Sequence, residues 1–377
     1  MNTSSNHHIA IAGAGLLGRL LAWRLQRFGH RVTLFEAGPL RTPAAAAHTA
    51  AGMIAPASEA VACEPSIYRM GIKSLKLWPQ WLRQLSIESN APDDSVDFQQ
   101  NGSLVVAHAQ DFNALKQFQQ NLHHTLSDSG EPDPYRWVDS ESIQTLEPDL
   151  AGTFHQGIFL NAEAHIDNRA LLQSLLREIE RLGADCHEHA EVEVAPYQIL
   201  RGGAAQRFDL VLDCRGVGAK KQWRELRGVR GEVLRVQTPE VHLNRPVRLM
   251  HPRYQLYVVP KRDHCFVIGA TQIESEDRRP VTLRSTLELS SALYTINPAF
   301  AEANILESGV NLRPGFADNL PRVEQQPGLI RANGLFRHGY LLAPVVVNQV
   351  LALIPPCQRA DDSITSVNSV HPGQRNT

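Results

Sequence analysis

The chain opens with apolar positions that switch from the spacing of a strand to that of a helix and back. Residues 9–12 form a short continuous apolar run, as expected of a strand buried on both faces. Leucines then repeat at helical spacing over residues 16–28, and residues 32–35 form a second apolar run. This order predicts a strand, a helix and a second strand of one Rossmann-like unit.

The rest of the pattern divides into further helices and strands. Apolar residues at helical spacing predict helices over residues 64–89 with an interruption near Pro79, 111–126, 139–146 with an N-cap at Asp139 or Ser140, 168–182, 281–303 and 341–354. Strands are predicted over residues 102–107, 185–194, 208–213, 232–236, 256–259 and 265–269. The short strands after residue 230, with turn signals between them, indicate an antiparallel sheet.

A chain of 377 residues exceeds one ordinary hydrophobic core, so two domains are expected. We predict an α/β fold in which a Rossmann-like dinucleotide-binding domain carries an inserted α+β domain with an antiparallel sheet. The discontinuous first domain comprises residues 1–90, 150–225 and 305–357, and the substrate-binding domain comprises residues 91–149 and 226–304. Residues 358–377 contain few large apolar side chains and are predicted to form a disordered tail.

Composition narrows the class of protein. Hydrophobic content of 43% and charged content of 20% are typical of a soluble globular protein. The net charge of −2 gives no reason to expect nucleic acid or an anionic membrane as a partner. The chain has no long apolar run, and its first eight residues lack the basic and apolar regions of a signal peptide. We therefore predict a cytoplasmic protein without an integral membrane segment.

The cysteines and histidines give no pattern of their own. The five cysteines are odd in number and form no Cys-x-x-Cys pair, so neither a disulfide framework nor a zinc site is predicted. The sixteen histidines are scattered, and the pairs at 7–8 and 123–124 lack partners at ligand spacing. No metal site is predicted.

The turn after the first strand carries glycines at the spacing of a dinucleotide-binding fingerprint. Gly13 allows the tight turn, Gly15 lets the backbone approach a pyrophosphate, and Gly18 lets the helix pack close to the sheet. The N–H groups and positive dipole at the helix start favour phosphate. Glu36 lies 21 residues after Gly15, where a carboxylate accepts ribose hydroxyls and disfavours the 2′-phosphate of NADP. The fingerprint predicts an adenine dinucleotide and leaves FAD and NAD open.

Further segments resemble one known family. They read His-Thr-Ala-Ala-Gly-Met-Ile-Ala-Pro at 48–56, Asn-Leu-Arg-Pro-Gly at 311–315 and Asn-Gly-Leu-Phe-Arg-His-Gly-Tyr-Leu-Leu-Ala-Pro at 333–344. Tyr-Val-Val-Pro-Lys at 257–261 and Val-Ile-Gly-Ala-Thr at 267–271 match the family's substrate-domain strands. With the N-terminal fingerprint, these segments resemble the D-amino-acid oxidase (DAO) superfamily, and most of all its glycine oxidase branch, used in thiamine biosynthesis. The resemblance implies an FAD-binding domain of the GR2/DAO type.

The resemblance also implies which residues hold a non-covalent FAD. In similar enzymes the loop at 51–53 meets the flavin, Glu36 and Ala37 lie near the ribose, and the backbone at Val192 meets the adenine. Backbone N–H groups of residues 337–342 would face the pyrimidine end of the flavin and stabilise negative charge on the reduced ring. The predicted cofactor-binding residues are Gly13, Ala14, Gly15, Leu16, Leu17, Gly18, Glu36, Ala37, Ala51, Gly52, Met53, Val192, Gly216, His338, Gly339, Tyr340, Leu341 and Leu342.

Three residues are candidates for holding the substrate. A guanidinium binds a carboxylate in a bidentate manner, and the family match gives Arg313 this role, although an arginine before Pro-Gly is more often a surface residue. Tyr257 matches a hydroxyl that reaches the substrate carboxylate, and Arg337 matches a second arginine near the flavin. Without the family context, a half-buried sheet tyrosine is a serious alternative for Tyr257, and a structural arginine is the alternative for Arg337.

The chain departs from the family pattern at several positions. Asn311 replaces a common glycine, the histidine that often precedes the residue matched by Phe336 is absent, and two glycines are lost between residues 318 and 324. Residues 214–218 replace a motif that usually ends in Trp-Ser. Arg313 and Arg337 are retained, so the arginines expected near the substrate carboxylate are present. The identity of the amino acid stays open.

The activity implied by the resemblance is FAD-dependent oxidative deamination of a small amino acid, glycine first. Molecular oxygen would be the acceptor, and the products would be an imine or glyoxylate, ammonia and hydrogen peroxide, with a place in thiamine thiazole synthesis. No catalytic acid–base side chain is predicted, since hydride transfer from a neutral amine needs none. By analogy with similar glycine oxidases, a homo-oligomer is expected.

Three alternatives stay open. The first is a related dehydrogenase or oxidase that acts on D-amino acids, sarcosine or proline with another acceptor. The second is an FAD-binding accessory protein without its own turnover. The third is an NAD-dependent dehydrogenase, which a yellow protein with a flavin spectrum would exclude.

Overall fold

The computed structural model describes residues 6–42, 44–89, 96–127, 133–251 and 255–354. The predicted disordered tail lies outside these residues. The described chain contains two large β-sheets, one of six strands and one of eight, and two small three-stranded sheets. None of the described helices is both long and apolar enough to cross a membrane.

The six-stranded sheet is a mostly parallel Rossmann-like sheet. Its strands, in spatial order, are β19 (Arg322–Gln326), β20 (Leu329–Asn333), β13 (Leu210–Asp213), β1 (His8–Ala12), β2 (Arg31–Phe35) and β9 (Asp185–His187). All neighbours pair in parallel except β19 and β20. Residues 9–12 of the central strand are fully buried, because both faces of the sheet are covered. The predicted strand–helix–strand unit is therefore confirmed.

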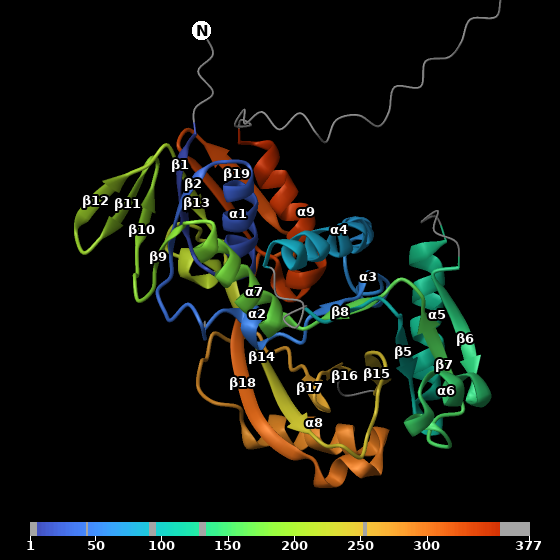
Figure 1. Cartoon of the computed structure of the whole chain (residues 1–377). Helices are drawn as coiled ribbons and strands as arrows, with labels where there is room; N and C mark the ends of the chain where they lie inside the picture. Colours follow the sequence, from blue (N-terminus) through green and yellow to red (C-terminus); the bar gives the residue numbers. More distant parts are fainter. Residues whose placement is uncertain (1–5, 43, 90–95, 128–132, 252–254, 355–377) are drawn as a thin grey trace, which may run out of the picture.

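Helices cover one face of this sheet and a small sheet covers the other (Figure 1). The helices are α1 (Leu16–Arg27), α4 (Pro65–Ser89), α7 (Asn168–Arg181) and α9 (Gly339–Ala352). The small sheet consists of β10 (Glu193–Ala195), β11 (Gln198–Arg201) and β12 (Ala204–Arg207). This layering leaves the carboxyl ends of β1, β2 and β13 open, which is where open α/β sheets bind ligands.

The eight-stranded sheet forms the second core. Its strands, in spatial order, are β18 (Asn304–Gly315), β14 (Arg227–Gln237), β17 (Cys265–Gly269), β16 (Gln255–Lys261), β15 (Val247–Met250), β5 (Ser103–Val106), β7 (Gln156–Leu160) and β6 (Tyr135–Asp139). It is antiparallel except for the pair β5–β15, so the predicted antiparallel sheet after residue 230 is confirmed. The accompanying helices are α5 (Phe112–Leu126), α6 (Ser140–Leu146) and α8 (Leu283–Ile296).

Short elements connect the two large sheets. The second small sheet consists of β3 (Met53–Ile54), β8 (Ala164–Ile166) and β4 (Phe98–Gln99). Two short helices flank β3 along the chain, α2 (Ala46–Thr49) and α3 (Pro56–Ala60). β14 and β18 run from beside the six-stranded sheet toward α8 (Figure 1). Their pairing spans eleven residues of β14, so the two parts of the molecule are linked by an extended ribbon.

Two segments pair in a different sheet from the one that the predicted domain boundaries imply. The predicted boundaries place residues 156–160 and 305–315 in the dinucleotide-binding domain, yet β7 pairs with β5 and β6, and β18 pairs with β14. The ladder hydrogen bonds of a strand decide its sheet, and these partners lie far away in sequence. The division into domains itself stays a prediction.

Three local predictions can be compared directly with the structure. α4 runs through Pro79 without a break, so the predicted interruption is wrong. Proline removes one helical hydrogen bond there, and the burial of Trp78 and Trp81 outweighs that loss. The single strand predicted over 185–194 is two strands, β9 and β10, with His189 at φ 51° between them. Asp139 is the N-cap of α6 and accepts a hydrogen bond from the Ser142 N–H at 2.9 Å, as predicted.

Candidate functional site

A cavity of about 1130 Å³ lies between the two large sheets. Its walls come from the turns after β1, β2 and β13, from β14, β16 and β18, and from the start of α9. This volume exceeds the upper end of about 1000 Å³ that is usual for small-ligand pockets. The cavity therefore has room for a ligand larger than those that small-ligand pockets usually hold.

The glycine turn at one end of the cavity contains glycines that the fold requires and one glycine that leaves space for a ligand. Gly13 has φ 96°, and a Cβ there would lie 2.6 Å from the Cys214 carbonyl oxygen. A Cβ on Gly18 would collide with the Gly13 carbonyl oxygen. A Cβ on Gly15 would meet nothing closer than Ala45, at 3.7 Å. The protein itself thus requires glycine at 13 and 18 but not at 15, which leaves open space beside Gly15 for a ligand.

Glu36, at the carboxyl end of β2, faces this turn. Its carboxylate accepts hydrogen bonds from the Ala14 N–H at 2.7 Å and from the Gly38 N–H at 3.2 Å. Arg215 follows β13 on the other side, where it forms an ion pair with Asp213 at 2.8 Å and donates to the Val192 carbonyl at 2.9 Å. Arg215 also lines the cavity. The sequence did not indicate this position, because a single arginine after a strand matches no motif.

Most of the predicted cofactor-binding residues line this one cavity. Ala14, Gly18 and Leu342 do not line it, and the last two are buried in the packing of α1 and α9. The lining residues among the predicted set are Gly13, Gly15, Leu16, Leu17, Glu36, Ala37, Ala51, Gly52, Met53, Val192, Gly216, His338, Gly339, Tyr340 and Leu341. Their contact with a cofactor stays a prediction.

The loop at 51–53 is held by the neighbouring strand β8. Gly52 has φ 74°, and its carbonyl accepts a hydrogen bond from the Ile166 N–H at 2.9 Å. The ammonium of Lys261 donates to the Ile166 carbonyl at 2.7 Å. Burial lowers the pKa of Lys261 to about 7, and the nearby Asp167 opposes the shift only in part. This lysine supports the loop from behind the cavity wall.

Lys261 should make stability depend on pH. The folded chain binds this proton less tightly than the unfolded chain, so the penalty for a charged Lys261 is full below about pH 7 and declines as pH rises toward the ordinary lysine pKa. We expect the stability of Lys261→Met relative to the wild type to fall by about 1–3 kcal/mol between about pH 7 and pH 10. Urea unfolding at both pH values measures this. A difference independent of pH would contradict the shifted pKa.

Arg313 and Tyr257 lie together at the other end of the cavity. The Arg313 guanidinium donates to the Thr271 carbonyl at 3.0 Å and to the Arg230 carbonyl at 3.4 Å. It lies flat over Gly231, where a Cβ would stand 2.6 Å from its Nη1 atom. Burial lowers the pKa of Arg313 and raises that of Tyr257. An arginine keeps its charge in spite of such a shift, so this end of the cavity presents a cation and a phenol.

Arg337 is held beside them by Glu59. Its Nε atom lies 2.6 Å from the Glu59 Oε2 atom, and its Nη1 atom donates to Gln272 at 3.2 Å. Burial would raise the pKa of Glu59, but Arg337, followed by a hydrogen bond from His338, holds it well below the usual range. Glu59 therefore stays ionised at neutral pH and positions the guanidinium of Arg337.

A further arginine makes this end of the cavity strongly positive. Arg248 on β15 lines the cavity, is only 8% exposed and donates to the Ser58 carbonyl at 3.3 Å. Arg248, Arg313 and Arg337 all line the cavity, and the charge of Glu59 acts on all three. Sequence reasoning missed Glu59 and Arg248, which lie outside every recognisable motif. The excess of positive charge suits an anionic substrate.

The fold and the cavity define a class of protein. A Rossmann-like sheet with a glycine turn and an acidic residue after β2 is typical of dinucleotide-binding proteins, and the positive end of the cavity is suited to a small anion. Such an arrangement is that of a dinucleotide-dependent oxidoreductase.

The chain belongs to the FAD-dependent oxidoreductase family DAO, whose model matches residues 8–349. It is 39% identical over 343 residues to a protein of Rhizobium etli that carries the name thiamine biosynthesis oxidoreductase ThiO, a match that covers 91% of this chain and 94% of that one. The recognition of the DAO superfamily, of its fold class and of FAD as cofactor is thereby confirmed.

Solved structures share the fold at lower identity. Glycine oxidase from Geobacillus kaustophilus superposes with a TM-score of 0.79 at 24% identity, covering 97% of this chain and all of that one. Iminodiacetate oxidase from Chelativorans superposes with a TM-score of 0.77 at 22% identity, covering 94% and 98%. At this identity the two structures support the fold alone.

The described residues fit FAD. The room beside Gly15 admits a pyrophosphate at the start of α1, and Glu36 lines the same cavity. Each of its carboxylate oxygens accepts one backbone hydrogen bond and can accept another from a ribose hydroxyl. The cavity continues from there along the loop at 51–53 to Arg313, so one extended ligand can reach from the glycine turn to the positive end.

Proposed function

We propose that the protein catalyses the oxidative deamination of a small amino acid, glycine first. The observation that carries this proposal is the placement of Arg313 near Tyr257 in the wall of the cavity that the glycine turn also lines. A guanidinium and a phenol are a suitable pair for one carboxylate. The proposal is supported by the similarity to the ThiO protein of Rhizobium etli and to a protein named glycine oxidase in Bacillus licheniformis.

In the proposed reaction, bound FAD supplies the hydride acceptor. Arg313 binds the substrate carboxylate and Tyr257 donates a further hydrogen bond, which together orient the Cα–H bond. Arg337, fixed by Glu59, closes the neighbouring wall. Glu59 is a poor proton acceptor because its pKa lies far below neutrality, so the amine is expected to bind in its neutral form.

The overall reaction consumes glycine, oxygen and water and yields glyoxylate, ammonia and hydrogen peroxide. The two electrons leave with the hydride, and the imine that remains is hydrolysed or passed on. The ThiO relative supports a role in thiamine biosynthesis, in which the imine would enter thiazole assembly.

A peroxide assay over glycine, sarcosine, D-alanine and D-proline tests the proposal. We expect the highest kcat/KM with glycine and oxygen-dependent peroxide release. Flavin reduction by glycine without peroxide would indicate another acceptor. Absence of flavin reduction by all four amines would contradict the proposed function.

Gly231 offers a second test of the carboxylate site. In Gly231→Ala the new Cβ would overlap the Arg313 guanidinium, so the arginine must leave its place. We expect KM for glycine to rise about tenfold or more, the equivalent of one charge-assisted hydrogen bond. Steady-state kinetics with thermal unfolding of the same samples measures this. An unchanged KM would mean that the observed position of Arg313 is not the one used for binding.

A further inference from the structure

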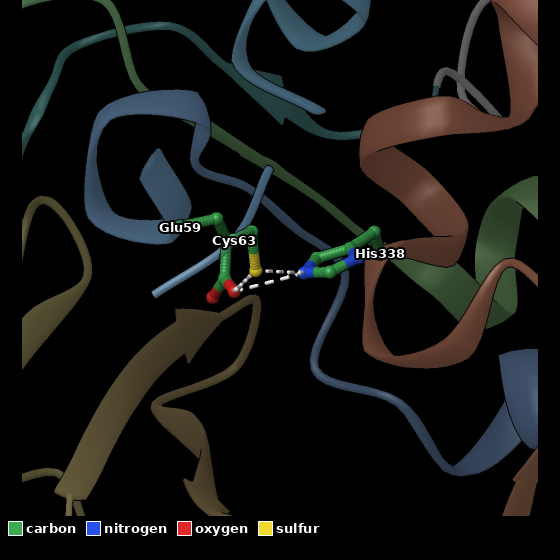
Figure 2. Close-up of side chains that lie close together, drawn as sticks. All are labelled: Glu59, Cys63 and His338. Carbon is green, nitrogen blue, oxygen red and sulfur yellow. Dashed lines mark hydrogen bonds and ion pairs between the residues drawn. The ribbon is translucent and has the colours of Figure 1, made fainter. Parts of the chain in front are cut away.

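Three metal-binding groups meet at the wall of the cavity near α9. They are the Glu59 carboxylate, the Cys63 thiol and the His338 imidazole, which Figure 2 shows pointing toward one another. The Cys63 Sγ atom lies 3.4 Å from His338 Nε2 and 3.9 Å from Glu59 Oε2, and Nε2 lies 3.0 Å from Oε2. None of these three residues belongs to a motif that the sequence analysis assigned to a metal.

The triangle of ligand atoms matches a tetrahedral zinc ion. Zinc–ligand bonds of about 2.0–2.3 Å at tetrahedral angles place sulfur and nitrogen about 3.5 Å apart, sulfur and oxygen about 3.5 Å, and nitrogen and oxygen about 3.3 Å. The observed distances are 3.4, 3.9 and 3.0 Å. Movements of a few tenths of an ångström would therefore complete three bonds.

The chemistry and surroundings of the groups also suit zinc. Thiolate, imidazole and carboxylate are its usual ligands, and three protein ligands leave a fourth position for water. The His338 side chain is only 1% exposed, so burial holds its ring in place with Nε2 directed at Cys63 and Glu59. Cys63 also lines an outer pocket of about 500 Å³ that carries Glu64 and Asp318, through which a cation can approach.

Arg337 already borders this triangle. Its guanidinium lies 2.6 Å from Glu59 Oε2 and 3.4 Å from His338 Nε2 through Nε, and 3.7 Å from Cys63 Sγ through Nη2. A zinc ion about 2 Å from the same oxygen would meet strong repulsion from this charge. The two cations therefore compete for Glu59.

We propose that Glu59, Cys63 and His338 form a zinc site, and that zinc binding displaces the guanidinium of Arg337 from Glu59. On binding, the thiol proton leaves to solvent, and the Nε2 proton that His338 shares with Glu59 leaves to solvent or to the Nδ1 atom of the same ring. No redox change takes place. The site goes beyond the proposed amino-acid oxidation, because it assigns these three residues to a ligand that the reaction does not use.

Metal binding to the holoenzyme, measured with zinc alone, tests the site. After dialysis against a chelator, we expect one zinc ion per chain in competition with a zinc dye. Cys63→Ser should bind at least tenfold more weakly, and Cys186→Ser, which removes another half-buried thiol, should bind like the wild type. With cobalt in place of zinc, a thiolate-to-metal charge-transfer band should appear in the wild type and Cys186→Ser and be absent in Cys63→Ser. Equal zinc affinity of Cys63→Ser and the wild type would overturn the site.

A second variant tests the competition. Arg337→Ala removes the competing cation, so we expect its zinc affinity to rise severalfold at unchanged stoichiometry. Unchanged or weaker binding would overturn the displacement. Flavin content and circular dichroism of each variant establish that it is folded. Because these readouts do not depend on turnover, a failure of the zinc site and a failure of the proposed oxidase activity can be told apart.

Discussion

Replacement of Arg313 by methionine is expected to lower kcat/KM for glycine by two to three orders of magnitude. Methionine keeps much of the apolar volume of the arginine and removes the guanidinium N–H groups that would bind a carboxylate. Two charge-assisted hydrogen bonds of about 1.5–3 kcal/mol each are lost, about 3–6 kcal/mol together, and the expected decrease corresponds to the lower part of this range, about 3–4 kcal/mol of transition-state binding. Rapid mixing of glycine with the oxidised enzyme under anaerobic conditions measures the rate of flavin reduction.

Arg279→Met is the matched control. Arg279 is 86% exposed and pairs with Asp277 at the surface, so its loss should leave flavin reduction unchanged. If Arg313→Met reduced its flavin as fast as this control, Arg313 would not be the carboxylate ligand.

The second large effect is expected in the glycine turn, where two similar substitutions should act differently. Gly13→Ala must adopt φ near 96° with its Cβ 2.6 Å from the Cys214 carbonyl, and should cost about 2–4 kcal/mol of stability even without cofactor. Gly15→Ala finds no neighbour within 3.7 Å, so the apoprotein should keep its stability within about 0.5 kcal/mol. Its FAD affinity should nevertheless fall at least tenfold, because the methyl group stands where the pyrophosphate must approach.

Urea unfolding of the apoproteins and FAD titration followed by fluorescence separate the two effects. A stable Gly15→Ala protein with unchanged FAD affinity would mean that the cofactor does not approach the backbone at this turn. A Gly13→Ala apoprotein as stable as the wild type would contradict the steric role of Gly13.

The dinucleotide-binding half of the site could be predicted because its signal is local. The strand, the glycine turn, the helix and Glu36 follow one another within thirty residues, and each has a sequence requirement of its own. Arg313, Tyr257 and Arg337 emerged only through resemblance to a family. No pattern in the residues themselves brings β16, β18 and the start of α9 to one cavity.

Glu59, Cys63 and Arg248 were missed for a related reason. Their roles depend on pairings between segments up to about 280 residues apart in sequence, such as Cys63 with His338. The same long-range pairing explains why β18 lies in the eight-stranded sheet and not with the strands that follow it. At Pro79 a local signal gave the wrong prediction. Proline usually breaks a helix, but the burial of the neighbouring tryptophans stabilises the helix through this position.

The bare backbone at Gly231 has a consequence for affinity. A long arginine side chain loses about 2 kcal/mol of rotamer entropy when it is immobilised. Arg313 lies flat on that glycine and donates to two carbonyls before any substrate arrives, so most of this entropy is lost during folding. A ligand with only a few atoms can then bind without the entropy cost of immobilising the Arg313 side chain. This allows an enzyme to work on one of the smallest metabolites in the cell.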